Sequence, residues 1–256
     1  MSGVNSHIQM PKCVLKNFVD DKQTLYHYDF ASGEINPGRA ASLNTEEGYY
    51  SQEVEDYLRD NIETPFGEVM RFVKSVSLKD TFSVGDDFHE RIRQFFYALM
   101  SRSSEMMSSV NRNSVFFQFI PEQHQHDYAA VKGIEIAKEK GLFDGYHVTF
   151  MFNDSKAPFV LPLHGFYQFG YRKAICLNLP ITPYCAITLF DKEHEAEFVQ
   201  DGMVKFLHCS DDEIIHALNK FAFITEREHN KKSIVCNQRS ELEKLVQEMI
   251  HDEGKL

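Results

Sequence analysis

The chain begins its folded pattern with the stretch His7-Ile8-Gln9-Met10-Pro11-Lys12-Cys13-Val14-Leu15-Lys16-Asn17-Phe18. Pro11 suits the first position of a helix, because its φ is already fixed near the helical value and its missing N–H needs no partner there. Val14, Leu15 and Phe18 then fall on one face of the short helix that follows. We therefore expect this stretch to fold inward as a buried N-terminal segment that carries one histidine.

Length and composition predict a chain with a core of its own. The 256 residues are 43% hydrophobic and include 22 phenylalanines but no tryptophan, which indicates a core packed largely from phenylalanine. We expect one α+β domain over residues 1–256, with a last helix over residues 239–252.

Cysteine usage and hydropathy indicate the compartment. The five cysteines are odd in number, scattered and without a C-x-x-C pair, which favours reduced thiols over a disulfide framework or a thiolate zinc site. The sequence shows no signal-peptide pattern and no apolar run long enough to cross a bilayer. We expect a cytoplasmic protein with no membrane partner.

The net charge of −11 limits the nucleic-acid partners that this chain can take. Lys and Arg side chains must displace counterions from phosphates, so an acidic surface opposes binding outside a local basic groove. One basic pair, Arg172-Lys173, follows Tyr167, Phe169 and Tyr171, whose alternate spacing resembles a ladder for stacking bases. The competing interpretation is an ordinary half-buried hairpin with a polar tip.

The sequence of the N-terminal half predicts a small hairpin followed by helices. Residues 25–30 alternate in polarity, Ser32-Gly33 supplies a turn, and residues 34–35 resume the pattern, which predicts a β-hairpin. Ser51 can cap a helix over the following residues, and Pro65 then kinks or ends it. Another helix begins at Ser83 or Asp86 and runs through Arg102 toward Met107, and a later helix, which follows a Phe-rich segment and Pro121, closes at Gly141.

The second half changes character. Short β-branched and aromatic runs at residues 146–152, 159–163, 175–179 and 186–190 predict a mainly antiparallel sheet. Asp211 or Ser210 caps a helix, residues 233–236 form a strand, and the last helix carries an apolar stripe from Leu242 to Ile250. The fold class is therefore α+β: a small hairpin, a helical N-terminal half, a mainly antiparallel sheet and C-terminal helices.

Several short blocks, taken in their order along the chain, resemble a known family. They are His7 to Phe18, Leu25-Tyr26-His27-Tyr28-Asp29 with Ser32-Gly33, Tyr49-Tyr50, the helix from Phe95 to Arg102, Leu179-Pro180-Ile181-Thr182-Pro183 and Leu218-Asn219. This set resembles a bacterial family catalogued as domain of unknown function 4238. The resemblance covers about residues 7–236 and implies a bacterial protein with site candidates but no assigned reaction. Members often carry a Ser-Asp-x-Pro turn after the strand at 159–163, where this chain has Leu161-Pro162-Leu163-His164.

One set of polar residues has the chemistry of a catalytic centre. An imidazole such as that of His7 suits an acid or base, Glu63 suits the carboxylate that orients it, and Arg102 suits the group that holds an anion. The competing interpretation is structural: His7 and Glu63 pin the N-terminal segment, and Arg102 anchors a loop.

Metal and cofactor patterns are weak. His124 and His126 would share a face if they lay on a strand, but no third ligand completes a standard pattern, so we expect no metal. The chain has no Walker loop, no Gly-x-Gly-x-x-Gly, no Gly-x-Ser-x-Gly and no His-Glu-x-x-His, and we expect no cofactor.

Two functions of different classes remain open. The first is a phosphoester hydrolase, such as a nuclease-like effector in conflict with phage or mobile elements, with His7, Glu63 and Arg102 as catalytic residues. Substrate-binding candidates for it are Lys12, Arg172, Lys173 and, from the Leu218-Asn219 block, Asn219. The second is a non-catalytic module that binds a protein partner or forms a homo-oligomer through the stripe on its last helix.

Overall fold

The computed structural model describes residues 5–76, 81–82, 86–113, 119–121, 124–194, 199–200 and 203–253. The chain divides into two compact units, each built from segments that are separated in the sequence. Unit 1 comprises Met1–Cys13, Asn44–Ser77 and Val84–Gly145, and unit 2 comprises Val14–Leu43, Leu78–Ser83 and Tyr146–Leu256. The expectation of one domain over the whole chain stays a prediction.

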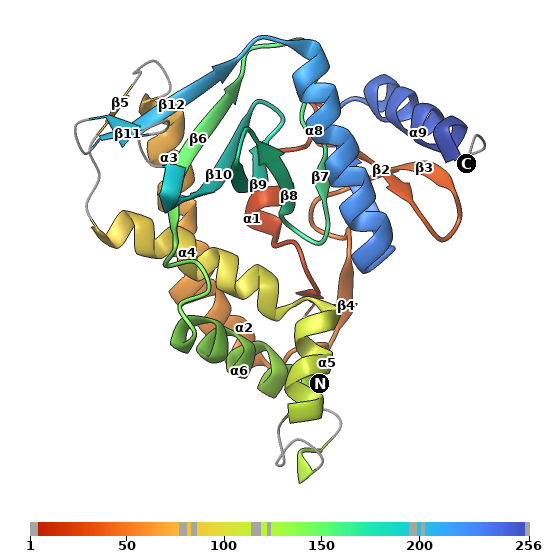
Figure 1. Cartoon of the computed structure of the whole chain (residues 1–256). Coiled ribbons are helices and arrows are strands. Elements are labelled where there is room, and N and C mark those ends of the chain that lie inside the picture. The colour runs from red at the N-terminus through yellow and green to blue at the C-terminus, as the bar shows by residue number, and fades with distance from the viewer. Residues whose placement is uncertain are drawn as a thin grey trace. The chain divides into compact units, whose positions relative to one another are not determined.

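Unit 1 is mainly helical. Its helices are α2 (Gln52–Leu58), the π-helix η1 (Arg59–Glu63), α3 (Thr64–Val76), α4 (Asp86–Ser101), α5 (Ser104–Asn113) and α6 (Gln125–Glu139). A two-stranded antiparallel sheet, which the sequence pattern did not predict, joins β1 (Asn5–His7) to β4 (Thr45–Glu47). Helices α4 and α6 lie side by side (Figure 1).

The core of unit 1 follows the apolar stripes of its helices. Phe66 of α3 and Phe95 of α4 are fully buried, and their rings stack with centroids 3.7 Å apart and planes 5° apart. Val69 of α3 and Ile92 of α4 are also buried, as is Ile62 of η1. The periodicity that predicted these helices therefore marked their buried faces.

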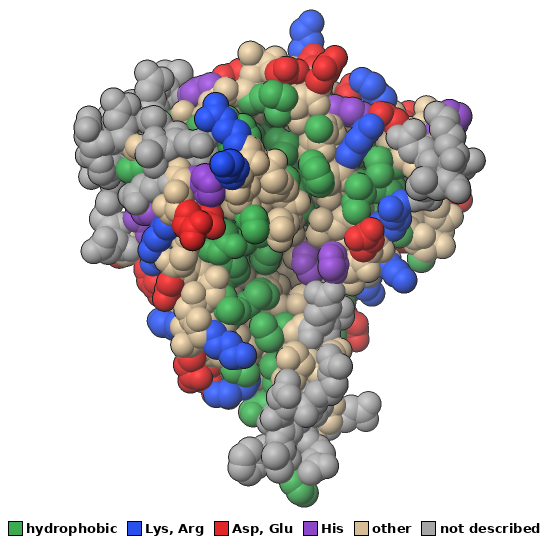
Figure 2. All heavy atoms as spheres, viewed as in Figure 1, with side chains coloured by type: hydrophobic (Ala, Val, Ile, Leu, Met, Phe, Trp, Pro, Cys, Tyr) green, Lys and Arg blue, Asp and Glu red, His purple; other side chains and the backbone are tan. Residues whose placement is uncertain are grey.

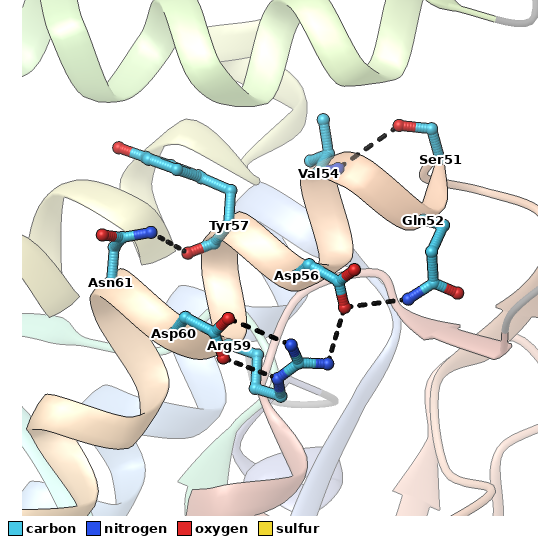
Figure 3. A network of polar contacts seen from close by, with 8 residues as sticks. All are labelled: Ser51, Gln52, Val54, Asp56, Tyr57, Arg59, Asp60 and Asn61. Carbon is cyan, nitrogen blue, oxygen red and sulfur yellow. Dashed lines mark hydrogen bonds and ion pairs between the residues drawn. The ribbon is translucent and has the colours of Figure 1, made fainter.

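The start of the first long helix is fixed locally. Ser51 Oγ accepts a hydrogen bond from the N–H of Val54 at 3.3 Å, which confirms Ser51 as the cap. Farther along, Arg59 donates to Asp56 at 2.6 Å and to Asp60 at 2.7 Å (Figure 3). These exposed charges are paired within one helical surface, and they lie in α2 and η1.

The helix does not end at Pro65. The chain passes from α2 through the π-helix η1 into α3, and Pro65 is the second residue of α3. Because the proline ring crowds the carbonyl of the residue four positions before it, a widened turn at this point gives the ring room. The predicted break is therefore taken up as a π-turn.

Unit 2 contains the large sheet. Its strands are β5 (Thr81–Phe82), β6 (Tyr146–Asn153), β8 (Tyr167–Tyr171), β9 (Ala174–Thr182), β10 (Cys185–Asp191), β11 (Val199–Gln200) and β12 (Met203–Cys209). They lie in the order β11-β12-β6-β10-β9-β8, with β5 paired to β12. All described pairs are antiparallel except β12 with β6, which is parallel.

A second sheet in unit 2 includes the predicted hairpin. Its order is β3 (Glu34–Gly38), β2 (Leu25–Asp29), β13 (Ser233–Cys236) and β7 (Leu161–Pro162). Gly33 adopts φ +71° in the turn between β2 and β3, a conformation that glycine takes without steric cost. The strand predicted over residues 159–163 pairs as a strand at only two of them.

Short and long helices complete unit 2. They are α1 (Lys12–Leu15), which begins in the last residues of unit 1, then η4 (Lys192–His194), α8 (Asp212–Thr225), the π-helix η5 (Glu226–Asn230) and α9 (Arg239–Glu253). Figure 1 shows α8 beside β8 and α9 beside the β2–β3 hairpin.

The stripe on the last helix is part of the core. Leu242, Leu245, Val246 and Met249 of α9 are all buried, in one cluster with residues of α8, β2 and β13. Ile250 is the member of the stripe that stays on the surface, with 53% of its area exposed. Homo-oligomer formation through α9 stays a prediction, and Ile250 is the apolar residue of the stripe available for it.

The predicted fold class is confirmed. The chain has a small N-terminal sheet, helices within residues 52–139, a mixed and mostly antiparallel sheet system within 146–236, and C-terminal helices. Over the residues described, no helix combines the length and the apolar character needed to cross a membrane.

Candidate functional site

Arg102 is the buried cation of unit 1. It lies in the short break between α4 and α5 and is only 3% exposed. Its Nη2 donates to Glu63 Oε1 at 2.9 Å, and its Nη1 donates to the carbonyl oxygen of Gln9 at 3.0 Å. Two of the three predicted catalytic residues are therefore in contact, and the same guanidinium holds the N-terminal segment.

A π-turn places the carboxylate of this pair. Glu63 is the last residue of η1, and a π-turn takes up an extra residue, which rotates the following side chains relative to those of α2. Ile62 stays in the core, whereas the side chain of Glu63 is 24% exposed and reaches Arg102. The carboxylate thus keeps some contact with solvent while its partner has almost none.

The electrostatics around Arg102 follow from burial. Burial raises the pKa of the Tyr50 hydroxyl and also that of Glu55, and the positive charge of Arg102 acts in the opposite direction on both. Tyr50 Oη and Arg102 Nε are buried, and neither has a hydrogen-bond partner among the residues described. Unit 1 therefore encloses a fixed positive charge, a neutral phenol and spare hydrogen-bonding capacity.

His7 and Lys12 lie near this centre along the chain. His7 is the last residue of β1, is partly buried and pairs in register with Thr45. In the part of the chain that the structure describes, the hydrogen bonds of Arg102 end at Glu63 and at Gln9, two residues beyond His7. Lys12 is exposed at the start of α1.

The paired histidines lie at a helix start and not on a strand. His124 precedes α6, and His126 is in its first turn, where residues two positions apart point in different directions. The ring of His126 stacks on Tyr49 with centroids 4.0 Å apart. Among the described side chains, no three or more of His, Cys, Asp or Glu are grouped to hold a metal ion.

In unit 2, three side chains of one helical stripe capture the backbone of residues 156–164. Asp212 accepts from the N–H of Lys156 at 2.9 Å and from that of Ala157 at 3.4 Å. Seven residues later, Asn219 accepts from the N–H of Val160 and donates to the carbonyl of Pro158, both at 2.9 Å.

Glu226 continues the same stripe after another seven residues. It is fully buried and accepts from the N–H of His164 at 2.7 Å, and from those of Lys232 and Ser233 at 3.2 Å. Because seven residues make about two helical turns, Asp212, Asn219 and Glu226 lie in line. Asn219, a substrate-binding candidate, has its amide committed to holding α8 against residues 158–160.

A cavity of about 570 Å³ lies between α8 and the sheet of unit 2. The helix contributes one face to it, with residues spaced i, i+3, i+4 and i+7: Ile214, Ala217, Leu218 and Phe221. The sheet contributes the side chains of one face: Met151, Phe169, Tyr171, Cys176, Thr188 and Leu207. Figure 2 shows hydrophobic side chains gathered over α8 and the strands beside it.

One cation stands at the rim of this cavity. Arg172 lines it, adopts φ +52° in the turn between β8 and β9, and places its guanidinium 5.4 Å from the centroid of the Tyr171 ring. The next residue, Lys173, is exposed and does not line the cavity. Of the two basic substrate-binding candidates in this turn, Arg172 is therefore at the cavity.

Sequence reasoning missed the cavity because it assigned its walls to the core. Ile214 and Phe221 belong to the apolar pattern of α8, yet they are 50% and 42% exposed. Ile215 is fully buried in the core, and Leu218, which also lines the cavity, is buried too. The sequence could have indicated the cavity, because α8 is apolar over more of its surface than one buried stripe requires.

A carboxylate on α9 holds the outer surface of α8. Glu248 accepts a hydrogen bond from Lys220 Nζ and contacts Nε2 of His216. The hydrogen bond from Lys220 is the largest effect on the pKa of Glu248 and lowers it, desolvation acts against this, and His216 lowers it further. Both bases lie on α8, so this contact couples the two C-terminal helices.

No family model, curated protein or solved structure matches the chain. The resemblance to domain of unknown function 4238 therefore stays a prediction.

Replacing the buried cation tests its structural role. We expect Arg102→Gln to lower the free energy of unfolding by about 3 kcal/mol, because it leaves the Glu63 carboxylate without its charge partner and the Gln9 carbonyl without its donor. Urea denaturation followed by circular dichroism measures the change. The matched control is Arg59→Gln, whose exposed ion pairs should matter little. An Arg102→Gln protein as stable as wild type would contradict this assignment.

Glu248 should add a pH-dependent part to stability. Its pKa is lowered in the folded chain, so its contribution is complete above the ordinary carboxyl range and is lost as the pH falls through the folded value. The stability difference between wild type and Glu248→Gln should therefore shrink between about pH 5 and about pH 3. Urea midpoints across this range measure it.

The same comparison made in a Lys220→Met background is the control. Since the hydrogen bond from Lys220 is the main cause of the lowered pKa, the pH dependence due to Glu248 should be weaker there. An equal dependence in both backgrounds would rule out Lys220 as its source.

Proposed function

We propose that this chain is a binding protein and that the cavity beneath α8 is its ligand site. The observation that carries this proposal is the cavity itself, because about 570 Å³ falls in the range of small-molecule sites. Its walls are apolar and aromatic, Thr188 is a polar group at its floor, and Arg172 is a cation at its rim. Such a combination of apolar walls and few polar groups is typical of pockets that bind small ligands.

The orientation of the nearest histidine favours binding over catalysis at this cavity. His208 is among the residues that line the cavity, although alternation along β12 directs its side chain to the sheet face opposite to that of Leu207 and Cys209. Its ring stacks on Phe152, and its Nδ1 lies 2.8 Å from Asp154 Oδ2. The imidazole is thus already engaged by Phe152 and Asp154.

Binding of anilinonaphthalene sulfonate tests this function. The probe is an aromatic anion, so wild-type protein should bind it with enhanced fluorescence. Phe221→Glu should weaken binding about tenfold or more, because it places a like charge in the wall. Ile250→Glu, a matched change at an exposed residue of α9 outside the cavity, should leave binding unchanged. Equal binding by all three proteins, or none by wild type, would overturn the proposal.

A second candidate function is phosphoester hydrolysis in unit 1, including a nuclease-like role against phage or mobile elements. The observation in its favour is that Arg102 joins Glu63 to the N-terminal segment that carries His7. In this reaction His7 is the base, Glu63 its partner, and Arg102 the group that binds the phosphate. The burial of Arg102 weighs against it, since a substrate must first reach the guanidinium.

Turnover of labelled nucleic acids tests the second candidate. Single- and double-stranded DNA and RNA are incubated with the purified protein and Mg²⁺ or Mn²⁺. A general base predicts a loss of about 100-fold or more in His7→Ala, with His124→Ala, an exposed histidine of the same unit, as the control. Absent turnover, or turnover that His7→Ala leaves intact, would end this candidate.

A further inference from the structure

The floor of the cavity belongs to a buried row of polar side chains across the sheet. Tyr167, Asn178 and Thr188 lie opposite one another on β8, β9 and β10, and all are almost completely buried. Thr188 Oγ1 donates to Asn178 Oδ1 at 2.7 Å, and Asn178 Nδ2 donates to Tyr167 Oη at 2.7 Å. The row lies on the face that α8 covers, and Thr188 is its member at the cavity.

The direction of these hydrogen bonds sets what the floor offers to a ligand. A threonine hydroxyl has one hydrogen to donate and two lone pairs that accept. Because the hydrogen of Thr188 is directed to Asn178, its oxygen can only accept from the cavity side. A ligand group that donates there is favoured, and a group that only accepts meets lone pairs without a hydrogen between them.

The opposite end of the cavity carries positive charge. Arg172 stands at the rim beside the half-exposed ring of Tyr171, on a chain whose net charge is −11. A guanidinium binds carboxylates and other oxyanions through charge-assisted hydrogen bonds. The cavity therefore has a cation at its rim and a hydrogen-bond acceptor at its floor, with apolar walls between them.

We propose that the ligand is an amphipathic organic acid with an aromatic or apolar body, an acid group at one end and a hydroxyl or N–H donor at the other. The acid pairs with Arg172 at the rim, the body lies between Phe169 and Phe221, and the donor reaches Thr188 Oγ1. This inference rests on the proposed function, because it requires that the cavity be the ligand site.

The register of the sheet gives the size of such a ligand. Thr188 lies two strands away from β8, in the same row as Tyr167. Tyr171 lies four residues beyond Tyr167 along β8. Strand spacing and rise per residue then separate the Cα atoms of Thr188 and Tyr171 by about 16 Å. Because both ends extend side chains toward the cavity, the ligand is on the order of 10 Å long.

Calorimetric titration with a matched set of acids tests the inference. The probes are 5-(4-hydroxyphenyl)pentanoate, 5-phenylpentanoate, 5-(4-methoxyphenyl)pentanoate and the methyl ester of the first. Wild-type protein should bind the hydroxy acid about tenfold more tightly than phenylpentanoate, because only the former donates to Thr188. The methoxy acid and the methyl ester should each bind about tenfold more weakly than the hydroxy acid.

Two variants assign the preferences to residues. Thr188→Val should remove the preference for hydroxy over unsubstituted acid, and Arg172→Gln should remove the preference for acid over ester. Lys173→Gln, the matched change at the neighbouring cation, should keep both preferences. Circular dichroism confirms that each variant is folded, and the wild-type comparison alone decides the case if Thr188→Val does not fold.

The outcomes separate this inference from the function on which it rests. If all four probes displace anilinonaphthalene sulfonate with equal affinity, the cavity is a ligand site but the inferred ligand class is wrong. If neither the sulfonate nor any acid binds, the proposed function fails and the inference with it. A preference for the methoxy acid over the hydroxy acid would reverse the inferred polarity of the floor.

Discussion

The hydrogen bonds from α8 to residues 156–164 are the constraint on which unit 2 depends. This segment runs beside the helix and pairs as a strand at only two residues, so most of its backbone groups need partners outside a sheet. Asp212, Asn219 and Glu226 supply them at intervals of two helical turns. An unpaired buried backbone group costs about 1 to 3 kcal/mol, so the contacts of Asn219 and Glu226, which are buried or partly buried, hold the helix against this segment.

The position of α8 in turn creates the cavity. The helix is held along one polar stripe by residues 156–164 and along an apolar stripe by Ile215, Leu218 and the core of unit 2. Two further apolar residues of the helix, Ile214 and Phe221, face the cavity and stay about half exposed. Exposed apolar side chains thus face a buried row of polar groups across the cavity. This arrangement supports the proposal of a ligand site over incomplete packing of the core.

Both units use a carboxylate in a π-turn as an anchor. Glu63 ends η1 and pairs with Arg102, and Glu226 begins η5 and collects three backbone N–H groups. The π-turn η1 offsets the side chains on its two sides relative to a regular helix, so Glu63 reaches Arg102 while Ile62 remains packed. Glu226 lies at the start of its π-turn and remains in line with Asp212 and Asn219. In unit 1 the anchoring carboxylate pairs with the buried Arg102. In unit 2 Glu226 binds backbone N–H groups and does not line the cavity beneath α8.

By itself the sequence determined the elements whose causes are local: the cap at Ser51, the turn at Gly33, a cap at Ser210 or Asp211, and the buried stripes of α3 and α4. Period and capping depend on residues within one or two turns, so they can be recognised without knowing the partners. The tertiary structure alone decided that β12 runs parallel to β6, that Arg102 is enclosed, and that Thr188 joins a polar row beneath an open face of α8. Each of these depends on the register between segments far apart in the chain, and neither period nor composition carries that register.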